Sequence, residues 1–372
     1  DTAAGHAIAR GAGCDVFHID GRTPLKYNKK DFKVSFYGNE KGKIEIKELE
    51  KKQPSGKQVL VKIDSCAICT LEQRFYTGVM NRYPFAGGHE AAGIVEAVGE
   101  EVKSVAPGDK VTVRLLTSCG ECYYCRNGHE NQCVVSFIAE THEGIGGPGG
   151  LSEYMMADAK NIYKMADDIN LEHAALTEPL ACCVHSIQNA DVQMGDDVVV
   201  IGVGIMGALH IQLAKLRGAR VIACEVDDAR LEVARKMGAD ITVNTKGIDA
   251  AAKIKELTDG RGADVVFCTV AISEIAADAV GMAGKIGRVV FYSSFHPDNP
   301  IEISPNKIHS TEQILTGSVN PQTKDFLIAT RLLSGKLIDV SELISATIPL
   351  NEIEDAFNKA VDPSTYRIIV KC

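Results

Sequence analysis

The hydrophobic and polar positions of the chain follow two different periods. In the first half, apolar and polar residues alternate in three short segments, at 57–64, 92–99 and 109–116, with glycine and proline between them. Alternation with a period of two is typical of half-buried strands. These segments therefore predict an antiparallel, barrel-like β domain, which begins near Lys33.

The pattern changes after Gly195. Short apolar runs, each followed by a stretch with helical periodicity, occupy residues 197–202, 220–225, 264–268 and 287–292. Strands that alternate with helices predict an α/β structure with a doubly wound parallel sheet. That sheet is complete near residues 314–318. The tail from Gln322 contains two helical stretches and a final strand, so we expect it to return to the first domain.

Length and pattern together predict two domains. A chain of 372 residues exceeds the usual single domain of about 100–200 residues. We expect residues 33–186 and 321–372 to form a β-rich domain, and residues 187–320 to form the parallel-sheet domain. Residues 1–32 lack clear periodicity, and the sequence assigns them no role.

Composition and charge exclude several classes of partner. The net charge is −9 and no basic run is present, so nucleic acid and anionic membranes are not expected partners. The apolar stretches are too short to span a bilayer, and the chain does not open with a secretory signal pattern, which favours a cytoplasmic protein. Twelve cysteines are many for such a chain, and four of them lie within fifteen residues. This spacing favours metal binding in a reducing compartment.

A glycine-rich turn follows the first apolar run of the parallel-sheet region. In the sequence IGVGIMGALH, Gly202, Gly204 and Gly207 have the G-x-G-x-x-G spacing. The first glycine permits a tight turn, the second lets a pyrophosphate approach the backbone, and the third lets helix and strand pack closely. The helix that begins at Ile205 and Met206 would direct its N-terminal amides at the phosphates. Strand, glycine turn and helix in this order predict a Rossmann dinucleotide-binding domain.

The choice of dinucleotide depends on the end of the next strand. Glu225 stands there, and its carboxylate is suited to accept both ribose hydroxyls and to repel a 2′-phosphate. Arg230, a few residues later, is a candidate to flank the adenosine ribose, although a solvated helix position explains it equally well. The sequence therefore predicts NAD rather than NADP as the cofactor.

A cluster of four cysteines has the pattern C-x2-C-x2-C-x7-C, formed by Cys119, Cys122, Cys125 and Cys133. Such short spacers allow four thiolates to meet on one tetrahedral ion, and four sulfur ligands leave no open coordination position. The reducing compartment disfavours disulfides. An iron–sulfur cluster remains an alternative, although the bacterial spacing for such clusters is absent. We therefore expect a structural zinc ion here.

Three further segments carry recognisable patterns: GHEAAGIVEAVGEEV at 88–102, GGLSEYMM at 149–156 and TEPLACCVHS at 177–186. Together with the glycine turn and the cysteine cluster, and in this order, they resemble the zinc-containing medium-chain dehydrogenases, which include alcohol, sorbitol and threonine dehydrogenases. The resemblance covers about residues 33–372. It implies that the β-rich domain is a GroES-like catalytic domain. The E-P-L element of the third segment is similar to the sorbitol and threonine branch.

The resemblance also implies a catalytic metal site. Its ligands would be Cys69, His89 and either Glu178 or Glu90, with one coordination position left open. Zinc in such a site acts as a Lewis acid, and the nicotinamide carries the hydride. Arg367, near the C-terminus, resembles a family arginine close to the metal glutamate and the cofactor. Two zinc ions per chain, one catalytic and one structural, are therefore expected.

The expected proton route differs from that of the better-known alcohol dehydrogenases. Where those relatives carry a serine or threonine and then a histidine after the cysteine ligand, this chain has Leu71 and Arg74. Neither side chain can exchange a proton in a protein. The glutamate that does not bind zinc is the leading replacement, and Thr70 is a second candidate. Glu72 is expected to steady His89 as a hydrogen-bond acceptor behind the metal.

These motifs predict an enzyme that transfers a hydride between NAD and a secondary alcohol of a polyol, sugar or amino alcohol. Two alternatives stay open. One is a zinc-independent enone or quinone reductase of the same superfamily, which the Cys69 and His89 pair disfavours. The other is an NAD-binding protein that has lost its activity and serves a structural or regulatory role. We further expect a small-molecule substrate, which the sequence does not name, and a homodimer or homotetramer.

Overall fold

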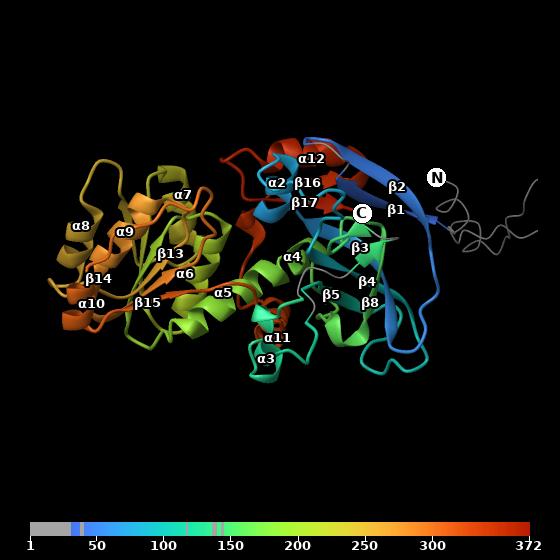
Figure 1. Cartoon of the computed structure of the whole chain (residues 1–372), viewed down its shortest axis with the longest axis horizontal. Coiled ribbons are helices and arrows are strands. Elements are labelled where there is room, and N and C mark those ends of the chain that lie inside the picture. The colour runs from blue at the N-terminus through green and yellow to red at the C-terminus, as the bar shows by residue number, and fades with distance from the viewer. Residues whose placement is uncertain (1–30, 38–40, 117, 136–139, 143–144) are drawn as a thin grey trace, which may run out of the picture.

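The computed structural model describes residues 31–37, 41–116, 118–135, 140–142 and 145–372. The segment 1–32 therefore lies almost entirely outside the described residues. The described chain forms two lobes, one built on a parallel sheet and one rich in antiparallel strands (Figure 1). We call them the parallel-sheet lobe and the β-rich lobe. Among the described residues, no helix has the length and apolarity needed to cross a bilayer.

The β-rich lobe contains a seven-stranded sheet. Its strands are β3 (Gln58–Ala67), β4 (Glu90–Val98), β5 (Lys110–Arg114), β8 (Tyr154–Asp158), β9 (Ile162–Lys164), β16 (Ile344–Pro349) and β17 (Arg367–Lys371). Neighbouring strands run antiparallel, except β16 and β17, which are parallel. Two ribbons accompany the sheet: β1 (Asp31–Tyr37) with β2 (Ile44–Glu50), and β6 (Glu140–His142) with β7 (Ile145–Gly146).

The tail of the chain completes this sheet, as the sequence predicts. β17 lies between β16 and β3, with Ile369 opposite Ala67. The sequence does not predict β16, which is half-buried, lies at the edge of the sheet and ends in Pro349. Proline is confined to strand edges and ends because it cannot donate to the ladder. The sequence of this segment therefore gives little indication of a strand.

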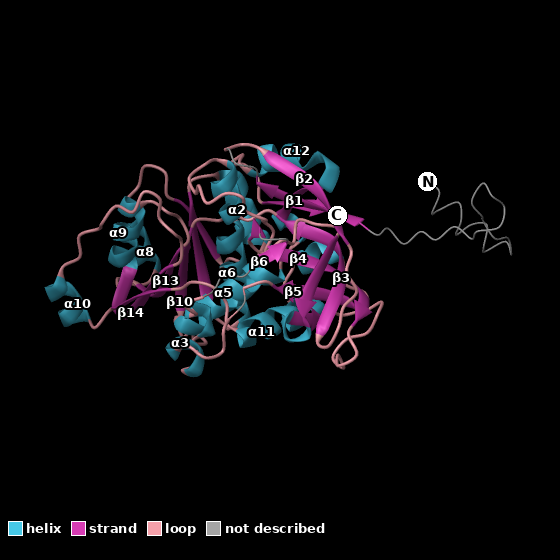
Figure 2. Cartoon of the chain, turned by 45° about the vertical axis from the view of Figure 1, so that its right-hand side comes forward, coloured by secondary structure: helices cyan, strands magenta, loops and turns pink. Residues whose placement is uncertain are grey.

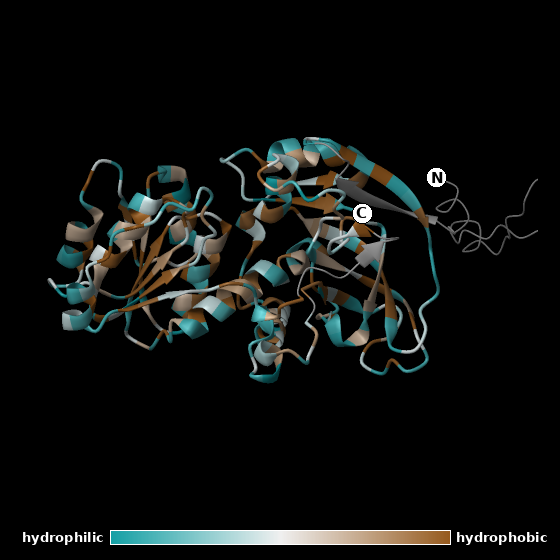
Figure 3. Ribbon diagram, viewed as in Figure 1, coloured by the Kyte–Doolittle hydropathy of each residue, from teal (hydrophilic) through white to brown (hydrophobic). Residues whose placement is uncertain are grey.

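The parallel-sheet lobe has six parallel strands in the order β12-β11-β10-β13-β14-β15. They are β10 (Asp197–Ile201), β11 (Arg220–Glu225), β12 (Ile241–Asn244), β13 (Ala263–Cys268), β14 (Ala283–Phe291) and β15 (Ile314–Gly317). The connecting helices are α6 (Ile205–Leu216), α7 (Asp228–Lys236), α8 (Ala250–Leu257), α9 (Ser273–Met282) and α10 (Pro305–Thr311). Hydrophobic residues concentrate in the strands of both lobes (Figure 3). The chain reverses direction across the sheet between β10 and β13, and such a switch point binds ligands at the carboxyl ends of the strands. The predicted α/β fold is therefore confirmed.

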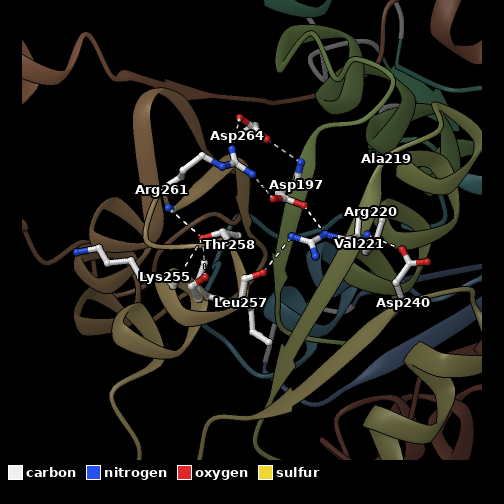
Figure 4. Close-up of polar contacts among 12 residues, drawn as sticks. Asp197, Ala219, Arg220, Val221, Asp240, Lys255, Leu257, Thr258, Arg261 and Asp264 are labelled. Carbon is white, nitrogen blue, oxygen red and sulfur yellow. Dashed lines mark hydrogen bonds and ion pairs between the residues drawn. The ribbon is translucent and has the colours of Figure 1, made fainter.

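The amino ends of these strands are closed by an ion-pair network (Figure 4). Asp197, which is only 3% exposed, accepts hydrogen bonds from Arg220 at 2.5 Å and from Arg261 at 2.9 Å. Its backbone N–H donates to the carboxylate of Asp264 at 2.8 Å. A buried carboxylate needs such charged partners to offset its loss of hydration. This network thus lies at the amino edge of the sheet, opposite the carboxyl edge at which the glycine turn follows β10.

Three helices connect the lobes: α4 (Leu171–Ala175), α5 (Thr177–Asn189) and α11 (Thr323–Ser334). α5 and α11 lie between the two sheets (Figures 1 and 2). One hydrophobic cluster runs through this region and includes Leu180 of α5, Val198 of β10 and Ile369 of β17. The two lobes therefore share a continuous core at α5. The remaining helices are α2 (Thr70–Tyr76), α3 (Tyr123–Arg126) and α12 (Ile353–Ala360).

Candidate metal and dinucleotide site

The four cysteines of the predicted cluster lie together in the segment after β5 that contains α3. Their Sγ atoms all lie within 4.8 Å of one another. The Sγ of Cys119 is 3.9 Å from that of Cys125 and 3.6 Å from that of Cys133. Four thiolates at about 2.3 Å from one tetrahedral zinc ion stand about 3.8 Å apart. The cysteines of the described residues are free thiols, so this cluster fits a metal ion and not disulfides.

Backbone amides point at these sulfur atoms. The Cys119 N–H donates to Cys133 Sγ at 3.3 Å, and the Cys122 N–H donates to Cys119 Sγ at 3.3 Å. The N–H of Cys125 donates to Cys122 Sγ and lowers the pKa of the Cys122 thiol to about 6. Hydrogen bonds to the charged form of a group favour that form. The local fold therefore favours the thiolate of Cys122, which is the form that binds zinc, whereas burial raises the pKa of the Cys125 thiol.

The cysteine cluster is anchored to the helices between the lobes by a polar network. The side-chain amide of Asn131, two residues before Cys133, donates to the Val319 carbonyl at 3.0 Å and lies 3.3 Å from His185 Nε2. His185, on α5, uses its Nδ1 to contact the buried carboxylate of Asp325 on α11 at 2.8 Å. A change in the fold of the cysteine segment would therefore disturb the hydrogen bonds of α5 and α11.

A second group of possible ligands lies at the inner edge of the β-rich lobe. The Sγ of Cys69, a ring nitrogen of His89 and a carboxylate oxygen of Glu90 all lie within 4.8 Å of one another. Cys69 caps the N-terminus of α2, His89 directly precedes β4, and Glu90 is the first residue of β4. A short helix and a strand end thus bring together residues that are twenty positions apart in the chain.

Glu72 orients the histidine of this group. Its Oε1 lies 2.8 Å from His89 Nδ1, and its Oε2 accepts from the Cys69 N–H at 3.2 Å. Burial would raise the pKa of the Glu72 carboxyl, but the charge and hydrogen bond of His89 outweigh it and hold that pKa below its usual range. This contact favours the proton on Nδ1 of His89, which leaves Nε2 available as a metal ligand.

Glu90 is held by Arg367, the first residue of β17. The guanidinium donates to both carboxylate oxygens, with Nε at 2.9 Å and Nη2 at 2.7 Å. Nη2 also lies 3.4 Å from the Sγ of Cys69. Both partners of this ion pair are buried. A bidentate arginine–carboxylate pair fixes the plane of the carboxylate, so Arg367 orients Glu90 toward the group.

Glu178, at the start of α5, approaches the same group from the helix between the lobes. Its Oε2 lies 4.0 Å from His89 Nε2, and its Oε1 accepts a hydrogen bond from the Cys182 thiol at 3.3 Å. Burial raises the pKa of the Glu178 carboxyl, even though His89 opposes the shift. The two glutamates therefore differ, because Arg367 binds both oxygens of Glu90, whereas one oxygen of Glu178 faces the histidine.

Three residues that follow Cys69, namely Thr70, Leu71 and Arg74, are not gathered into this group. Thr70 is exposed at the first position of α2, a position that does not favour it as a proton carrier. Leu71 packs against the hydrophobic core of the β-rich lobe. Arg74 instead reaches across the cleft, where its guanidinium donates to the Ser294 carbonyl after β14 at 2.9 Å.

The glycine turn follows β10 at the carboxyl edge of the parallel sheet. Gly202 has a φ of +87°, and a Cβ at Gly207 would lie 1.9 Å from the Gly202 carbonyl oxygen. Both positions therefore require glycine for the turn and for close packing. At Gly204 a Cβ would meet only Arg230 Nη1, at 3.5 Å. The space beside Gly204 is thus open toward the cleft, which fits the approach of a pyrophosphate to the first turn of α6.

The other predicted cofactor residues surround this turn. Glu225, the last residue of β11, accepts from the Val203 N–H at 2.9 Å and from the Val226 N–H at 2.7 Å. Ile205 and Met206 form the first turn of α6. Arg230, on α7, donates to the Pro363 carbonyl at 2.5 Å. Arg230 is therefore held at the turn by the tail of the chain and is not simply solvated.

Comparisons with known proteins agree with this geometry. Residues 55–167 match the family model described as alcohol dehydrogenase GroES-like domain, and residues 202–335 match the one described as zinc-binding dehydrogenase. D-arabitol-phosphate dehydrogenase of Enterococcus avium is 31% identical over 322 residues, which cover 84% of this chain and 90% of that protein. The chain belongs to the zinc-type medium-chain dehydrogenase family. This dehydrogenase is therefore an oxidoreductase, and its β-rich lobe contains the GroES-like fold.

Solved structures resemble the dehydrogenase over nearly its whole length. A zinc-binding dehydrogenase from Sinorhizobium meliloti 1021, bound to NADP, has a TM-score of 0.84 and 27% identity, and the match covers 92% of this chain and 100% of that one. A structure described as a short chain alcohol dehydrogenase from E. coli CFT073, in complex with NADH, has the same TM-score, sequence identity and coverage of the two chains. The two neighbours hold different nicotinamide dinucleotides, so the likeness does not select between NAD and NADP.

A cavity of about 600 Å³ opens in the dehydrogenase beside the carboxyl ends of β14 and β15. Its lining comes from α5, from the strand ends and from the cysteine segment, and the polar members include His129, Gln132, Gln188, Asn189, Ser293, Ser294, Ser318 and Lys324. Among the described residues that line it, none is acidic. The Ser318 hydroxyl is buried and has no hydrogen-bond partner within the described structure. The cavity therefore offers hydrogen-bonding groups to a polar ligand.

Two functional candidates of the dehydrogenase do not emerge from its sequence motifs. Cys182 contacts Glu178, and the Tyr366 hydroxyl donates to the Val203 carbonyl in the glycine turn at 3.1 Å. Cys182 stands one helical turn after Glu178, so helical spacing was a usable signal. Tyr366 and Val203 are 163 positions apart, and no local pattern links them.

Proposed function

We propose that this protein is a zinc-dependent, NAD-linked dehydrogenase that acts on a secondary alcohol of a polyol, sugar or amino alcohol. The observation that carries the proposal is the convergence of a thiol, an imidazole and a carboxylate within 4.8 Å of one another. Thiolate, imidazole and carboxylate are the ligand types that zinc takes in catalytic sites. A homodimer or homotetramer also stays a prediction.

The ligand set that we propose is Cys69, His89 and Glu90. These three residues supply ligand atoms that are all mutually close. Glu178 contacts only the histidine of the three, at 4.0 Å. We therefore propose that Glu178 does not bind the metal and that it faces the coordination position that is left open. The cysteine cluster is proposed to hold the second, structural zinc ion.

Each side chain then has a defined task. A zinc ion held by Cys69, His89 and Glu90 would supply Lewis-acid chemistry at the substrate oxygen. Glu72 holds the proton of His89 on Nδ1, and Arg367 fixes the carboxylate plane of Glu90. Glu178 accepts the proton that the substrate alcohol gives up, directly or through water. Leu71 and Arg74 take no part in this transfer because neither side chain exchanges a proton.

The cofactor that we propose is NAD. The open space beside Gly204 would take the pyrophosphate, and Glu225 lies at the end of β11 where an adenosine ribose is expected. A carboxylate there accepts from ribose hydroxyls and repels a 2′-phosphate. Arg230 donates a hydrogen bond to the Pro363 carbonyl. We therefore propose that Arg230 stays at the turn and does not bind a 2′-phosphate.

The lining of the cavity supports the proposed substrate class. Its lining is rich in hydroxyl, amide and imidazole groups and lacks acidic side chains among the described residues. α5 carries Glu178 and, seven residues later, His185 on the cavity wall, so the cavity begins about 10 Å along the helix from that glutamate. A molecule with several hydroxyl groups would satisfy these donors and acceptors better than a simple alkanol. The D-arabitol-phosphate dehydrogenase similarity agrees with this choice.

A substrate screen tests the proposal. Reduction of NAD at pH 9 is followed with polyols, sugars, amino alcohols and simple alkanols, and the zinc content of the same protein is measured. We expect turnover that is fastest with polyhydroxylated or amino alcohols, and two zinc ions per chain. Binding of NADH without turnover of any member of the panel would favour the inactive alternative. Reduction of enones by a zinc-free protein would favour the reductase alternative.

A further inference from the structure

Tyr366 lies between the glycine turn and the candidate metal group. It directly precedes β17 of the β-rich lobe and is half-buried. Its hydroxyl donates to the Val203 carbonyl at 3.1 Å, and the guanidinium of Arg230 stands over its ring at 5.2 Å from the centroid. Val203 and Arg230 both belong to the parallel-sheet lobe. The tyrosine therefore joins the two lobes at the point where a dinucleotide is expected.

The hydrogen bond acts on the backbone of the turn. The Val203 carbonyl and the Gly204 N–H belong to one planar trans peptide, so they point in opposite directions. A donor that holds the carbonyl also sets the direction of the Gly204 N–H. The Val203 N–H on the preceding peptide is fixed by Glu225 at 2.9 Å. Both peptides of Val203 are thus oriented by side chains before any ligand arrives.

The direction of the Gly204 N–H is relevant because Gly204 caps α6. Amides at the start of a helix are the groups that meet a phosphate. Burial raises the pKa of the Tyr366 phenol, so its hydroxyl stays protonated and remains a donor at neutral and alkaline pH.

The next residue in the chain, Arg367, contacts the candidate metal group. Arg367 holds both oxygens of Glu90 and lies 3.4 Å from Cys69 Sγ. In an extended chain, consecutive side chains point to opposite sides. Tyr366 and Arg367 therefore reach the glycine turn and the metal group from two adjacent positions of one backbone.

We propose that Tyr366 is a positioning residue that presets the phosphate-binding turn and ties it to the strand that carries Arg367. The inference rests on the proposed binding of a nicotinamide dinucleotide. Its consequence is that the tyrosine hydroxyl contributes to affinity for the pyrophosphate and not for the adenosine. Removal of one neutral hydrogen bond of this kind weakens an interaction by roughly 3–10-fold.

The test uses Tyr366→Phe in the full-length protein. Dissociation constants are measured for NADH, for ADP, which has the pyrophosphate, and for adenosine, which lacks it. We expect weaker binding of NADH and ADP by about 3–10-fold, with unchanged binding of adenosine. The KM for NAD should rise by a similar factor, whereas kcat at saturating NAD should stay within about 2-fold of the wild-type value.

Tyr76→Phe is the matched control. The Tyr76 hydroxyl donates to Asn358 at 2.9 Å, and both residues belong to the β-rich lobe. This variant loses an equivalent hydrogen bond without a contact to the turn, so its affinity for ADP should equal that of the wild type. Tyr366→Leu, which also removes the ring under Arg230, should weaken ADP binding at least as much as Tyr366→Phe.

Three outcomes would overturn the inference. One is unaltered binding of ADP and NADH by Tyr366→Phe. Another is an equal loss for adenosine, which would indicate general loosening of the lobe. The third is an equal effect in Tyr76→Phe. If the wild-type protein itself bound neither NADH nor ADP, the proposed function would fall together with the inference, and this result is distinct from the other three.

Discussion

At Glu90 and Glu178, one type of side chain occupies two different electrostatic settings. Arg367 binds both oxygens of Glu90, whereas Glu178 is buried with one oxygen toward His89 and the other bound by a thiol. Replacement of each by glutamine keeps the shape and removes the charge. The two variants should therefore fail in different ways.

We expect Glu178→Gln to keep a zinc content near two per chain and to lower kcat by about 100-fold, because general-base help is worth roughly 10²–10⁴ in rate. Glu90→Gln should lose zinc from the catalytic site. Burial raises the pKa of Glu178, and a base acts only when deprotonated, so wild-type kcat should rise with pH through that pKa. Glu178→Gln should lack this rise.

Zinc analysis and pH–rate profiles check both variants. Glu172→Gln, on the neighbouring helix α4, is the control, and it should keep the wild-type rate and zinc content. An unchanged kcat and pH profile in Glu178→Gln, with both zinc ions retained, would rule out this carboxylate as the base. Loss of zinc from Glu178→Gln instead of Glu90→Gln would exchange the two assignments.

Glu225 is the residue that we expect to carry the proposed preference for NAD. Its carboxylate meets backbone amides of the turn and lies where the ribose is expected. Hydrogen bonds to a charged group contribute about 1.5–3 kcal/mol, so Glu225→Ala should narrow the ratio of kcat/KM for NAD over NADP by roughly 10–100-fold. Glu232→Ala, on the exposed side of α7, should leave the ratio unchanged. A wild-type protein that uses NADP as well as NAD would contradict the prediction.

Much of the candidate site could be predicted from sequence because its residues lie in contiguous motifs. The cysteine cluster, His89 with Glu90, and the glycine turn each occupy a short segment whose spacing limits its chemistry. The roles of Arg74 and Tyr366 could not be predicted, since their partners are 220 and 163 positions away. Such contacts depend on how the two lobes meet, and no local period encodes that.

At the scale of elements, the segment around α3 is joined to the rest of the protein mainly through polar side chains. Asn131 reaches His185 and the Val319 carbonyl, and His185 reaches Asp325. A segment with little hydrophobic core depends on its metal for a defined shape. We therefore expect loss of the metal from the cysteine cluster to lower the stability of the protein. Through α5, it should also disturb the lining of the cavity.

Cys122→Ser tests this role. We expect the variant to lose one zinc ion per chain and to lower the midpoint of thermal unfolding by several degrees, since the binding of a structural metal contributes to the free energy of folding. Cys372→Ser, outside the cluster, should keep both zinc ions and unfold near the wild-type temperature. Full zinc content in Cys122→Ser would show that the four thiols do not share an ion.

The elements themselves were predictable to different degrees. Five of the six strands of the parallel sheet could be predicted from sequence, because apolar runs mark such strands and every residue of β10, for example, is buried. β12, which has only four residues, was missed. β16 and β9 were missed, since one is a half-buried edge strand and the other has only three residues. Short or partly exposed strands offer too few alternations to be distinguished from loops.

At the scale of the whole molecule, the lobes are coupled by α5, by α11 and by contacts across the cleft. One hydrophobic cluster extends from the parallel sheet through α5 to the sheet of the β-rich lobe. Arg74 and Tyr366 of the β-rich lobe add two polar contacts, because each donates a hydrogen bond to a backbone carbonyl of the parallel-sheet lobe. Large hydrophobic interfaces restrict domain motion, so closure around a cofactor would involve the cleft side of the lobes and leave the α5 side in place.

The position of β17 has a consequence for how the chain is made. β17 follows every other described strand in the chain, pairs with β3 and β16 inside the sheet of the β-rich lobe and carries Arg367. The strands of the parallel sheet, in contrast, are contiguous from residue 197 to 317, and a nascent chain folds such units as they emerge. The half expected to bind the dinucleotide can therefore fold before the half expected to hold the catalytic metal has received β17, the strand that carries Arg367.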